Sequence, residues 1–307
     1  MTGPLGVLKY AELTMSDLQK INPRRAICLI TVSPLEVHGP HLPVGADVFV
    51  GEKLQEEYCR TLAGRYPGYR LVLLPPLYAG CDPLPFKGSI PVRARTLESL
   101  LWDYVQGLAG QGFRLLMVCD NHGGPSHQIA MEIVARRAWR RYGFALINPF
   151  NVIFRKMVLN DPYFLKLVSL SPGECGDDPD AHAGTNETSL MLASREELVR
   201  GWKEVAPSLQ PEWSGISALA GRLGHILGRI GLTGISADLV HLANLLAWVN
   251  SPDKKPYLGS PGLADPESGH RMIKGHVSVA MDLLEEAMAG KKPSTRPMLW
   301  WIRAFRR

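Results

Sequence analysis

Three short segments rich in glycine and proline combine histidine with carboxylate side chains. They span residues 33–47, 119–125 and 180–189. The side chains that could bind a ligand are Glu36, His38, His41, Asp47, His122, His182 and Glu187. Imidazole and carboxylate ligands without a thiolate suit a catalytic Zn²⁺, Mn²⁺ or Fe²⁺ better than a structural zinc. The three segments therefore predict a metal site that carries out chemistry.

The local sequence indicates how some of these side chains are presented. Glu36 and His38 stand two residues apart in an extended segment, so they point the same way and both can reach one metal ion. His122 is followed by two glycines, which let the backbone approach a ligand closely. His41 alone is expected to be an ordinary core or surface histidine. His182 and Glu187 stand where a loop enters a predicted helix, with Thr185 or Asn186 as its cap.

The elements that must position these segments alternate along the chain. Buried strands are predicted at residues 26–32, 70–74, 114–119 and 145–148, and helices at 48–64, 96–110, 126–141 and 265–288. Thr96 and Ser99 can cap the second helix. The alternation predicts an α/β fold with a mainly parallel sheet and helices on both faces. Such folds place their chemistry at the carboxyl ends of the strands, where the candidate segments lie.

Composition excludes several classes of protein. Of the 307 residues, 46% are hydrophobic and 21% charged, which is typical of a globular protein and rules out wholesale disorder or a polytopic membrane protein. The net charge of +5 comes from the tail at residues 291–307, which holds six basic and no acidic residues. Without it, 28 basic and 29 acidic residues give −1. We therefore expect no nucleic-acid surface on the body of the fold.

Cysteine usage and apolar stretches predict a cytoplasmic protein. Five scattered cysteines give neither a disulfide framework nor a zinc ribbon. Cys119 is expected to be a buried strand residue and not a nucleophile. The N-terminal residues lack the pattern of a signal peptide, and residues 239–252 are too short to span a bilayer.

The motifs resemble those of one known family. Residues 36–47, EVHGPHLPVGAD, closely resemble the Glu-x-His-Gly-x-His-Leu-Pro-x-Gly-x-Asp signature of the creatininase (creatinine amidohydrolase) family. The NHGG and HAGTNETS segments at 121–124 and 182–189 are similar to two further motifs of that family. KGSI at 87–90 and the segment 257–264 also resemble family elements.

This resemblance implies a three-layer α/β/α fold, a homohexamer, and a site in which two divalent metal ions hold an activated water. Glu36 and His122 would bind one metal and His38 the other, with Asp47 bridging both. Glu187 would complete the second metal's ligands. His182 would handle a proton or orient the substrate, and Glu187 would share the catalytic work.

The sequence departs from the family pattern at two positions near the site. Gly124 stands where creatininase has a glutamate ligand, so the second metal depends more on Glu187 and a one-metal enzyme is an alternative. Asp178, in an acidic stretch, replaces a tryptophan that packs on substrate. Creatinine is therefore not the expected substrate, and a cationic or polar one fits better.

We predict a single domain over residues 1–290, with a helical glycine-rich insert at 208–250. Glycines three or four residues apart in the insert are typical of a close helix-packing face. The tail at 291–307 is an arm on a neighbouring subunit, a membrane-surface anchor or, third, a nucleic-acid contact. The predicted function is metal-dependent cleavage of a non-peptide C–N bond in a small cyclic or linear amide. The alternatives are a maturation peptidase or formamide hydrolase, and a non-catalytic scaffold protein.

Overall fold

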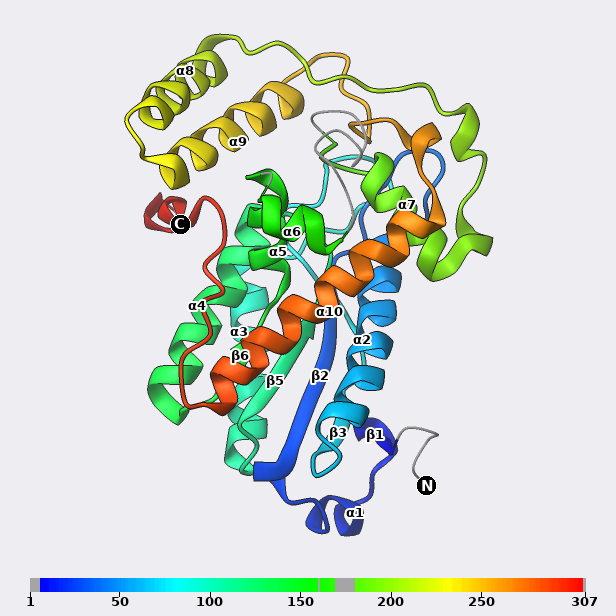
Figure 1. The fold of residues 1–307 in the computed structure, drawn as a ribbon, viewed down its shortest axis with the longest axis vertical. Coiled ribbons are helices and arrows are strands. Elements are labelled where there is room, and N and C mark those ends of the chain that lie inside the picture. The colour runs from blue at the N-terminus through cyan, green and yellow to red at the C-terminus, as the bar shows by residue number, and fades with distance from the viewer. Residues whose placement is uncertain (1–5, 160, 169–179, 306–307) are drawn as a thin grey trace. The chain divides into compact units, whose positions relative to one another are not determined.

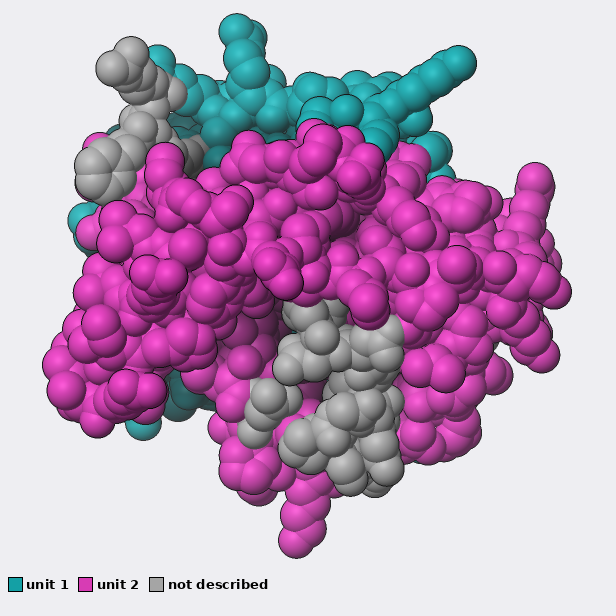
Figure 2. Space-filling model, turned by 90° about the horizontal axis from the view of Figure 1, so that it is seen from above, with its two compact units in different colours: residues 1–36, 44–153, 273–297 teal, residues 37–43, 154–272, 298–307 magenta. Residues whose placement is uncertain are grey.

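The computed structural model describes residues 6–159, 161–168 and 180–305 (Figure 1). The prediction about Asp178 lies outside these residues. The chain divides into two compact units, which Figure 2 distinguishes by colour. The first comprises residues 1–36, 44–153 and 273–297, and the second comprises 37–43, 154–272 and 298–307. Whether they act as one domain stays a prediction.

The first unit contains a parallel sheet. Its strands are β1 (Val7–Lys9), β2 (Ala26–Ser33), β3 (Arg70–Leu73), β4 (Leu77–Tyr78), β5 (Leu115–Cys119) and β6 (Ala145–Ile147). Their order is β1-β3-β2-β5-β6, with β4 beside β2. Cys28 on the central strand is opposite Val72 and Leu116. All eight residues of β2 are buried, which explains why this strand reads as a continuous apolar run.

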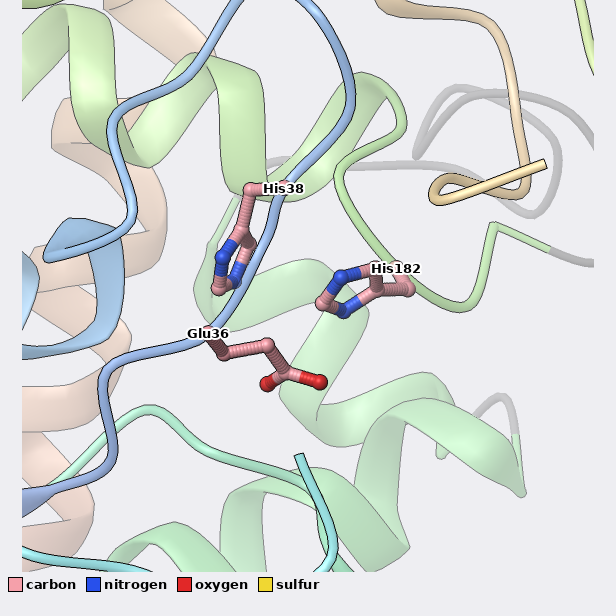
Figure 3. Close-up of side chains that lie close together, drawn as sticks. All are labelled: Glu36, His38 and His182. Atoms are coloured by element: carbon pink, nitrogen blue, oxygen red, sulfur yellow. The ribbon is translucent and has the colours of Figure 1, made fainter. Parts of the chain in front are cut away.

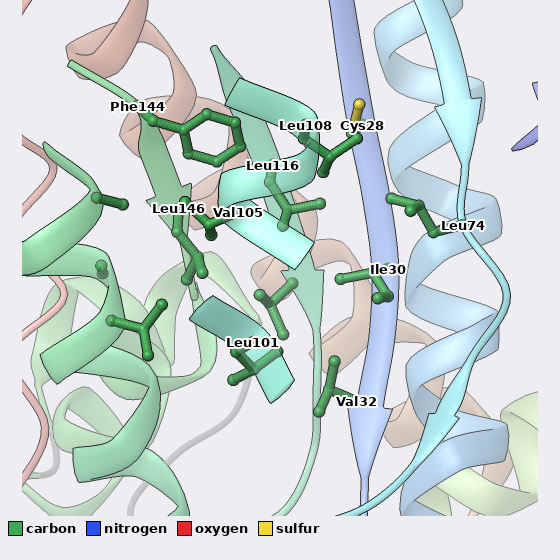
Figure 4. Close-up of a cluster of buried hydrophobic side chains, with 14 of the residues drawn as sticks. Cys28, Ile30, Val32, Leu74, Leu101, Val105, Leu108, Leu116, Phe144 and Leu146 are labelled. Atoms are coloured by element: carbon green, nitrogen blue, oxygen red, sulfur yellow. The ribbon is translucent and has the colours of Figure 1, made fainter. Parts of the chain in front are cut away.

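Helices cover both faces of this sheet, as predicted. The unit contains α1 (Met15–Gln19), α2 (Ala46–Arg65), α3 (Ala94–Gly110), α4 (Pro125–Tyr142), the start of α5 (Phe150–Val158) and most of α10 (Pro266–Met288). On one face, Ile30 and Val32 of β2 join Leu101 and Val105 of α3 in the core shown in Figure 4. The other face meets α2 so closely that a Cβ on Gly51 would lie 2.7 Å from Thr31.

The second unit is mainly helical. It contains α6 (Pro162–Leu167), α7 (Thr185–Arg195), α8 (Gly215–Arg229), α9 (Thr233–Val249), the end of α5 and the start of α10. The glycine-rich stretch forms the hairpin of α8 and α9, and its glycines do form a packing face. A Cβ on Gly221 would lie 2.2 Å from the ring of Trp213, and one on Gly224 would lie 3.0 Å from Val240. Gly231 instead takes a positive φ of 83° in the turn between the helices.

Two predicted helix caps are wrong. Helix α3 begins at Ala94, before Thr96 and Ser99, and Arg93 is its N-cap. Helix α7 begins at Thr185 with Gly184 as N-cap, and neither helix has a side-chain cap. The Thr185 hydroxyl instead donates to the carbonyl oxygen of Ser260.

The structure also bears on Cys119, on the C-terminal tail and on the question of a membrane-spanning helix. Cys119 is fully buried, and burial raises the pKa of its thiol well above the ordinary value, as expected of an inert strand residue. Within the tail, Trp300 is buried and the Arg303 guanidinium lies 4.5 Å from its ring centre. Among the described residues, no helix is both long and apolar enough to cross a bilayer.

Candidate metal centre

Glu36, Asp47 and His122 form a buried cluster in the first unit. Glu36 follows β2, Asp47 lies in the first turn of α2, and His122 follows β5. The Nδ1 atom of His122 lies 2.9 Å from a carboxylate oxygen of Glu36 and 3.3 Å from one of Asp47. None of the three residues is more than 3% exposed. This is a set of three ligand atoms that one metal ion could share.

Backbone groups fix how two members of this first cluster are oriented. The Nε2 atom of His122 lies 2.8 Å from the carbonyl oxygen of Cys81, to which it donates. Nδ1 is therefore the ring atom that faces the two carboxylates, and it can bind a metal once it has lost its proton. The backbone N–H of Leu84 donates to Glu36 at 2.6 Å. Such outer partners hold metal ligands in a binding orientation before the metal arrives.

A network behind His122 was not predicted from the sequence. One oxygen of Asp120 accepts from Ser33 at 2.7 Å and from the backbone N–H of His122 at 3.1 Å. The amide nitrogen of Gln128 donates to Asp120 and to the carbonyl oxygen of His122, each at 2.5 Å. Asn148 donates to the other end of the Gln128 amide at 2.7 Å. Four buried polar side chains thus fix the turn that carries His122.

The two buried carboxylates of the first cluster favour a positive charge beside them. Burial disfavours the charged imidazolium of His122. This effect is outweighed by Glu36 and Asp47, which attract the imidazolium by their charge and accept hydrogen bonds from it. Together they raise the pKa of His122 well above its ordinary value. In the metal-free protein, a proton therefore compensates for part of the carboxylate charge.

His38, His182 and Glu187 form a second cluster, in the second unit. A carboxylate oxygen of Glu187 lies 3.6 Å from Nε2 of His38 and 3.6 Å from Nδ1 of His182. The centres of the His38 and His182 rings are 4.3 Å apart and the ring planes are tilted by 35°. Figure 3 shows both side chains. Nε2 of His182 donates to the carbonyl oxygen of Val37 at 2.9 Å, so Nδ1 is the atom that faces Glu187.

The turn before α7 holds Glu187 in place at a cost in backbone strain. The N–H of Ala183 donates to Glu187 at 2.6 Å. Ala183 itself has a φ of +47°, which residues with a Cβ rarely adopt. Strain of this kind persists where the surroundings impose it, often at functional sites.

His41 behaves as the ordinary core histidine that the sequence predicts. Its Nε2 atom lies 2.9 Å from the hydroxyl of Thr188. Burial, with the nearby charge of His38, lowers the pKa of His41 to about 4, so the ring is neutral at physiological pH. The other six candidate residues belong to the two polar clusters, with Glu36, Asp47 and His122 in the first and His38, His182 and Glu187 in the second. The chain passes from one cluster to the other between Glu36 and His38.

Comparison with known proteins places the chain in a family. The family model described as "Creatininase: Creatinine amidohydrolase" matches residues 11–284. The chain belongs to the creatininase family. It is accordingly an amidohydrolase, and the resemblance seen in its motifs is confirmed.

Two curated relatives show how varied the substrates of similar proteins are. A mycofactocin precursor peptide peptidase from Mycobacterium ulcerans (strain Agy99) is 26% identical over 248 residues, which cover 73% of this chain and 86% of that protein. A 3-dehydro-scyllo-inosose hydrolase from Thermotoga maritima is 24% identical over 215 residues, covering 69% of this chain and 63% of that protein.

Solved creatininase structures share the fold. A structure described as creatininase Mn has a TM-score of 0.63 at 17% identity, covering 91% of this chain and 98% of that one. A mutant creatininase of Zn-Zn type has a TM-score of 0.60 at 16% identity over the same shares. These neighbours carry manganese or zinc, and at this level of identity they establish the three-layer α/β/α fold alone.

Proposed function

We propose that this creatininase-family protein is a metal-dependent hydrolase of a non-peptide C–N bond in a small cyclic or linear amide. The observation that supports it best is that a backbone carbonyl fixes the tautomer of a histidine in each cluster. In both cases the other ring nitrogen, Nδ1, is turned toward a carboxylate.

The donor set fits divalent cations. Two carboxylates leave the first cluster with a net negative charge even when His122 is protonated, and a buried charge is costly without a cation. Glu36 and His122 would hold one ion, and His38 and Glu187 a second, with Asp47 shared as the family resemblance implies. Their nitrogen and oxygen ligands suit Zn²⁺, Mn²⁺ or Fe²⁺. Such ions, when bound, polarise an amide carbonyl and lower the pKa of a water.

His182 supplies the proton transfer in this proposal. Its Nε2–H is committed to the carbonyl of Val37, so Nδ1 is the atom that takes up and releases a proton. A carboxylate oxygen of Glu187 lies 3.6 Å from this Nδ1 atom. A proton held at Nδ1 can pass to the leaving nitrogen of the amide, which would otherwise depart as an unstable anion.

Elemental analysis of the purified protein is the first test. We expect about two metal ions per chain, lost in Asp47→Ala and kept in the control Asp253→Ala, whose side chain is exposed. About one ion would favour the formamide hydrolase. Absence of metal from metal-replete protein would overturn the proposal and favour the scaffold.

A maturation peptidase is the second candidate, because the Mycobacterium relative is named as a peptide peptidase. Hydrolysis of lactams, hydantoins, formamides and short peptides by the metal-loaded protein separates the two. Cleavage of peptides alone would favour the peptidase. A homohexamer and a cytoplasmic location, both expected from the sequence, remain proposals that light scattering and cell fractionation can check.

A further inference from the structure

Trp248 stands beside His182, although it comes from none of the three motif segments. It lies in the last turn of α9, within the glycine-rich insert. The centres of the Trp248 and His182 rings are 5.8 Å apart, with the ring planes tilted by 41°. The indole is 5% exposed. The insert therefore contributes an aromatic side chain next to the proposed proton-transfer residue.

The hairpin that carries Trp248 is held together independently of the site. The indole N–H of Trp213 donates to the side-chain oxygen of Asn244 on α9 at 2.8 Å. The same Trp213 ring packs over Gly221 of α8, where no larger residue fits. These contacts fix α9 and, with it, the position of Trp248.

The indole N–H of Trp248 has no hydrogen-bond acceptor among the described residues, although it is shielded from solvent. The indole N–H of Trp213, by contrast, is paired with the side chain of Asn244. Leaving a buried donor unpaired costs free energy, and a donor kept in this state needs an explanation. An acceptor on a ligand would remove this cost.

We propose that Nε1 of Trp248 donates a hydrogen bond to a second carbonyl oxygen of the substrate while its ring forms an apolar wall beside His182. This rests on the function proposed above. The acceptor is neutral because the Glu187 carboxylate, 3.6 Å from Nδ1 of His182, would repel a substrate carboxylate. The substrate class is then an imide, a hydantoin or a diamide, which carries a second carbonyl, and not a simple lactam.

The test compares succinimide with 2-pyrrolidinone, which has the same ring and lacks the second carbonyl. Both are titrated into zinc-loaded protein while the indole ¹H–¹⁵N signals are followed, with the Trp248 signal assigned by its loss in Trp248→Phe. We expect the Trp248 indole proton to move downfield with succinimide. Succinimide should bind about tenfold more tightly than the lactam, and Trp248→Phe should abolish this difference.

A matched control separates the outcomes. Trp202→Phe removes another indole N–H of the same unit that lacks an acceptor among the described residues, and it should leave the tenfold preference unchanged. An unchanged preference in Trp248→Phe, or no binding of succinimide to the wild type, would each overturn the inference. Absence of metal from the wild type would instead defeat the proposed function itself.

Discussion

The Nε2 atom of His122 donates to the carbonyl oxygen of Cys81, 2.8 Å away, and thereby turns Nδ1 toward Glu36 and Asp47. This one bond selects the ring nitrogen that would bind the metal. It also explains the residue at position 124, because a Cβ there would lie 2.4 Å from Nε2 of His122 and 2.6 Å from the Cys81 oxygen. The glycine therefore leaves room for this hydrogen bond.

Gly124→Ala should accordingly weaken metal binding at the first cluster about 10- to 100-fold, the range found when an outer partner of a ligand is disturbed. Calorimetric titration of the apo protein with Zn²⁺ would measure it. The control is Gly107→Ala in α3, where a Cβ would meet no atom within 4 Å. That change should leave affinity unaltered and stabilise the helix by about 0.5–1 kcal/mol. Equal affinity in Gly124→Ala and wild type would contradict the argument.

Gln128 should matter as much as a metal ligand, although it touches none of the carboxylates in the first cluster. Replacing it with methionine keeps the volume but removes its bonds to Asp120, His122 and Asn148. We expect metal affinity to fall about 10- to 100-fold and the melting temperature to drop. Gln19→Met, at an exposed position, is the control and should change neither the metal affinity nor the melting temperature appreciably. A variant that is less stable but binds metal normally would show that the network serves folding alone.

Metal binding should release a proton from His122. Its pKa is raised in the metal-free protein, so the ring carries a proton that the metal must displace. By the same linkage, the protonated His122 ring stabilises the folded protein fully at pH values below the pKa that His122 has in the unfolded chain. This stabilisation is lost as the pH rises through the higher pKa of His122 in the folded protein. Apparent zinc affinity should therefore fall as pH is lowered through that raised pKa.

Calorimetry in two buffers of different ionisation enthalpy counts the released protons. Close to one proton per zinc is expected in the pH range where the metal-free ring is protonated, and fewer in Glu36→Gln, which removes the main charge that raises the His122 pKa. If wild type and variant release the same number, His122 is not the source.

The fold was predictable because its strands are buried on both faces. A strand such as β2, with every residue buried, reads as an unbroken apolar run, and the predicted range of 26–32 differs from the observed one by a single residue. Helix starts were less predictable. The threonine and serine of α3 that could cap a helix lie inside it, because tertiary packing starts the helix at Ala94.

The ligand motifs were visible because they are local, but their supporting residues are not. Asp120 and Gln128 gave a weak signal, since a glutamine that faces the core of an amphipathic helix must have buried partners. Trp248 gave none. Helix α9 is apolar around most of its circumference, so periodicity could not show which side chain reaches His182, 66 positions earlier in the chain.

His276 should make folding stability depend on acid. It is 3% exposed on α10, and burial, partly offset by the charge of Asp120, lowers its pKa to about 4. The unfolded chain thus binds a proton more readily than the folded one between about pH 6.5 and 4. The stability due to the neutral ring is complete above the upper value and is lost as pH falls, by about 3 kcal/mol in total.

Urea unfolding of the metal-free protein at several pH values would measure this dependence. In His276→Gln, the slope of the unfolding free energy near pH 5 should be smaller than in wild type by about 1.4 kcal/mol per pH unit, the contribution of one proton. His270→Gln, an exposed site on the same helix, is the matched control and should keep the wild-type slope. The comparison uses the slope of the unfolding free energy against pH. A general loss of packing in His276→Gln lowers the unfolding free energy at every pH and leaves this slope unchanged. Parallel curves for wild type and His276→Gln would show that the buried ring does not resist protonation.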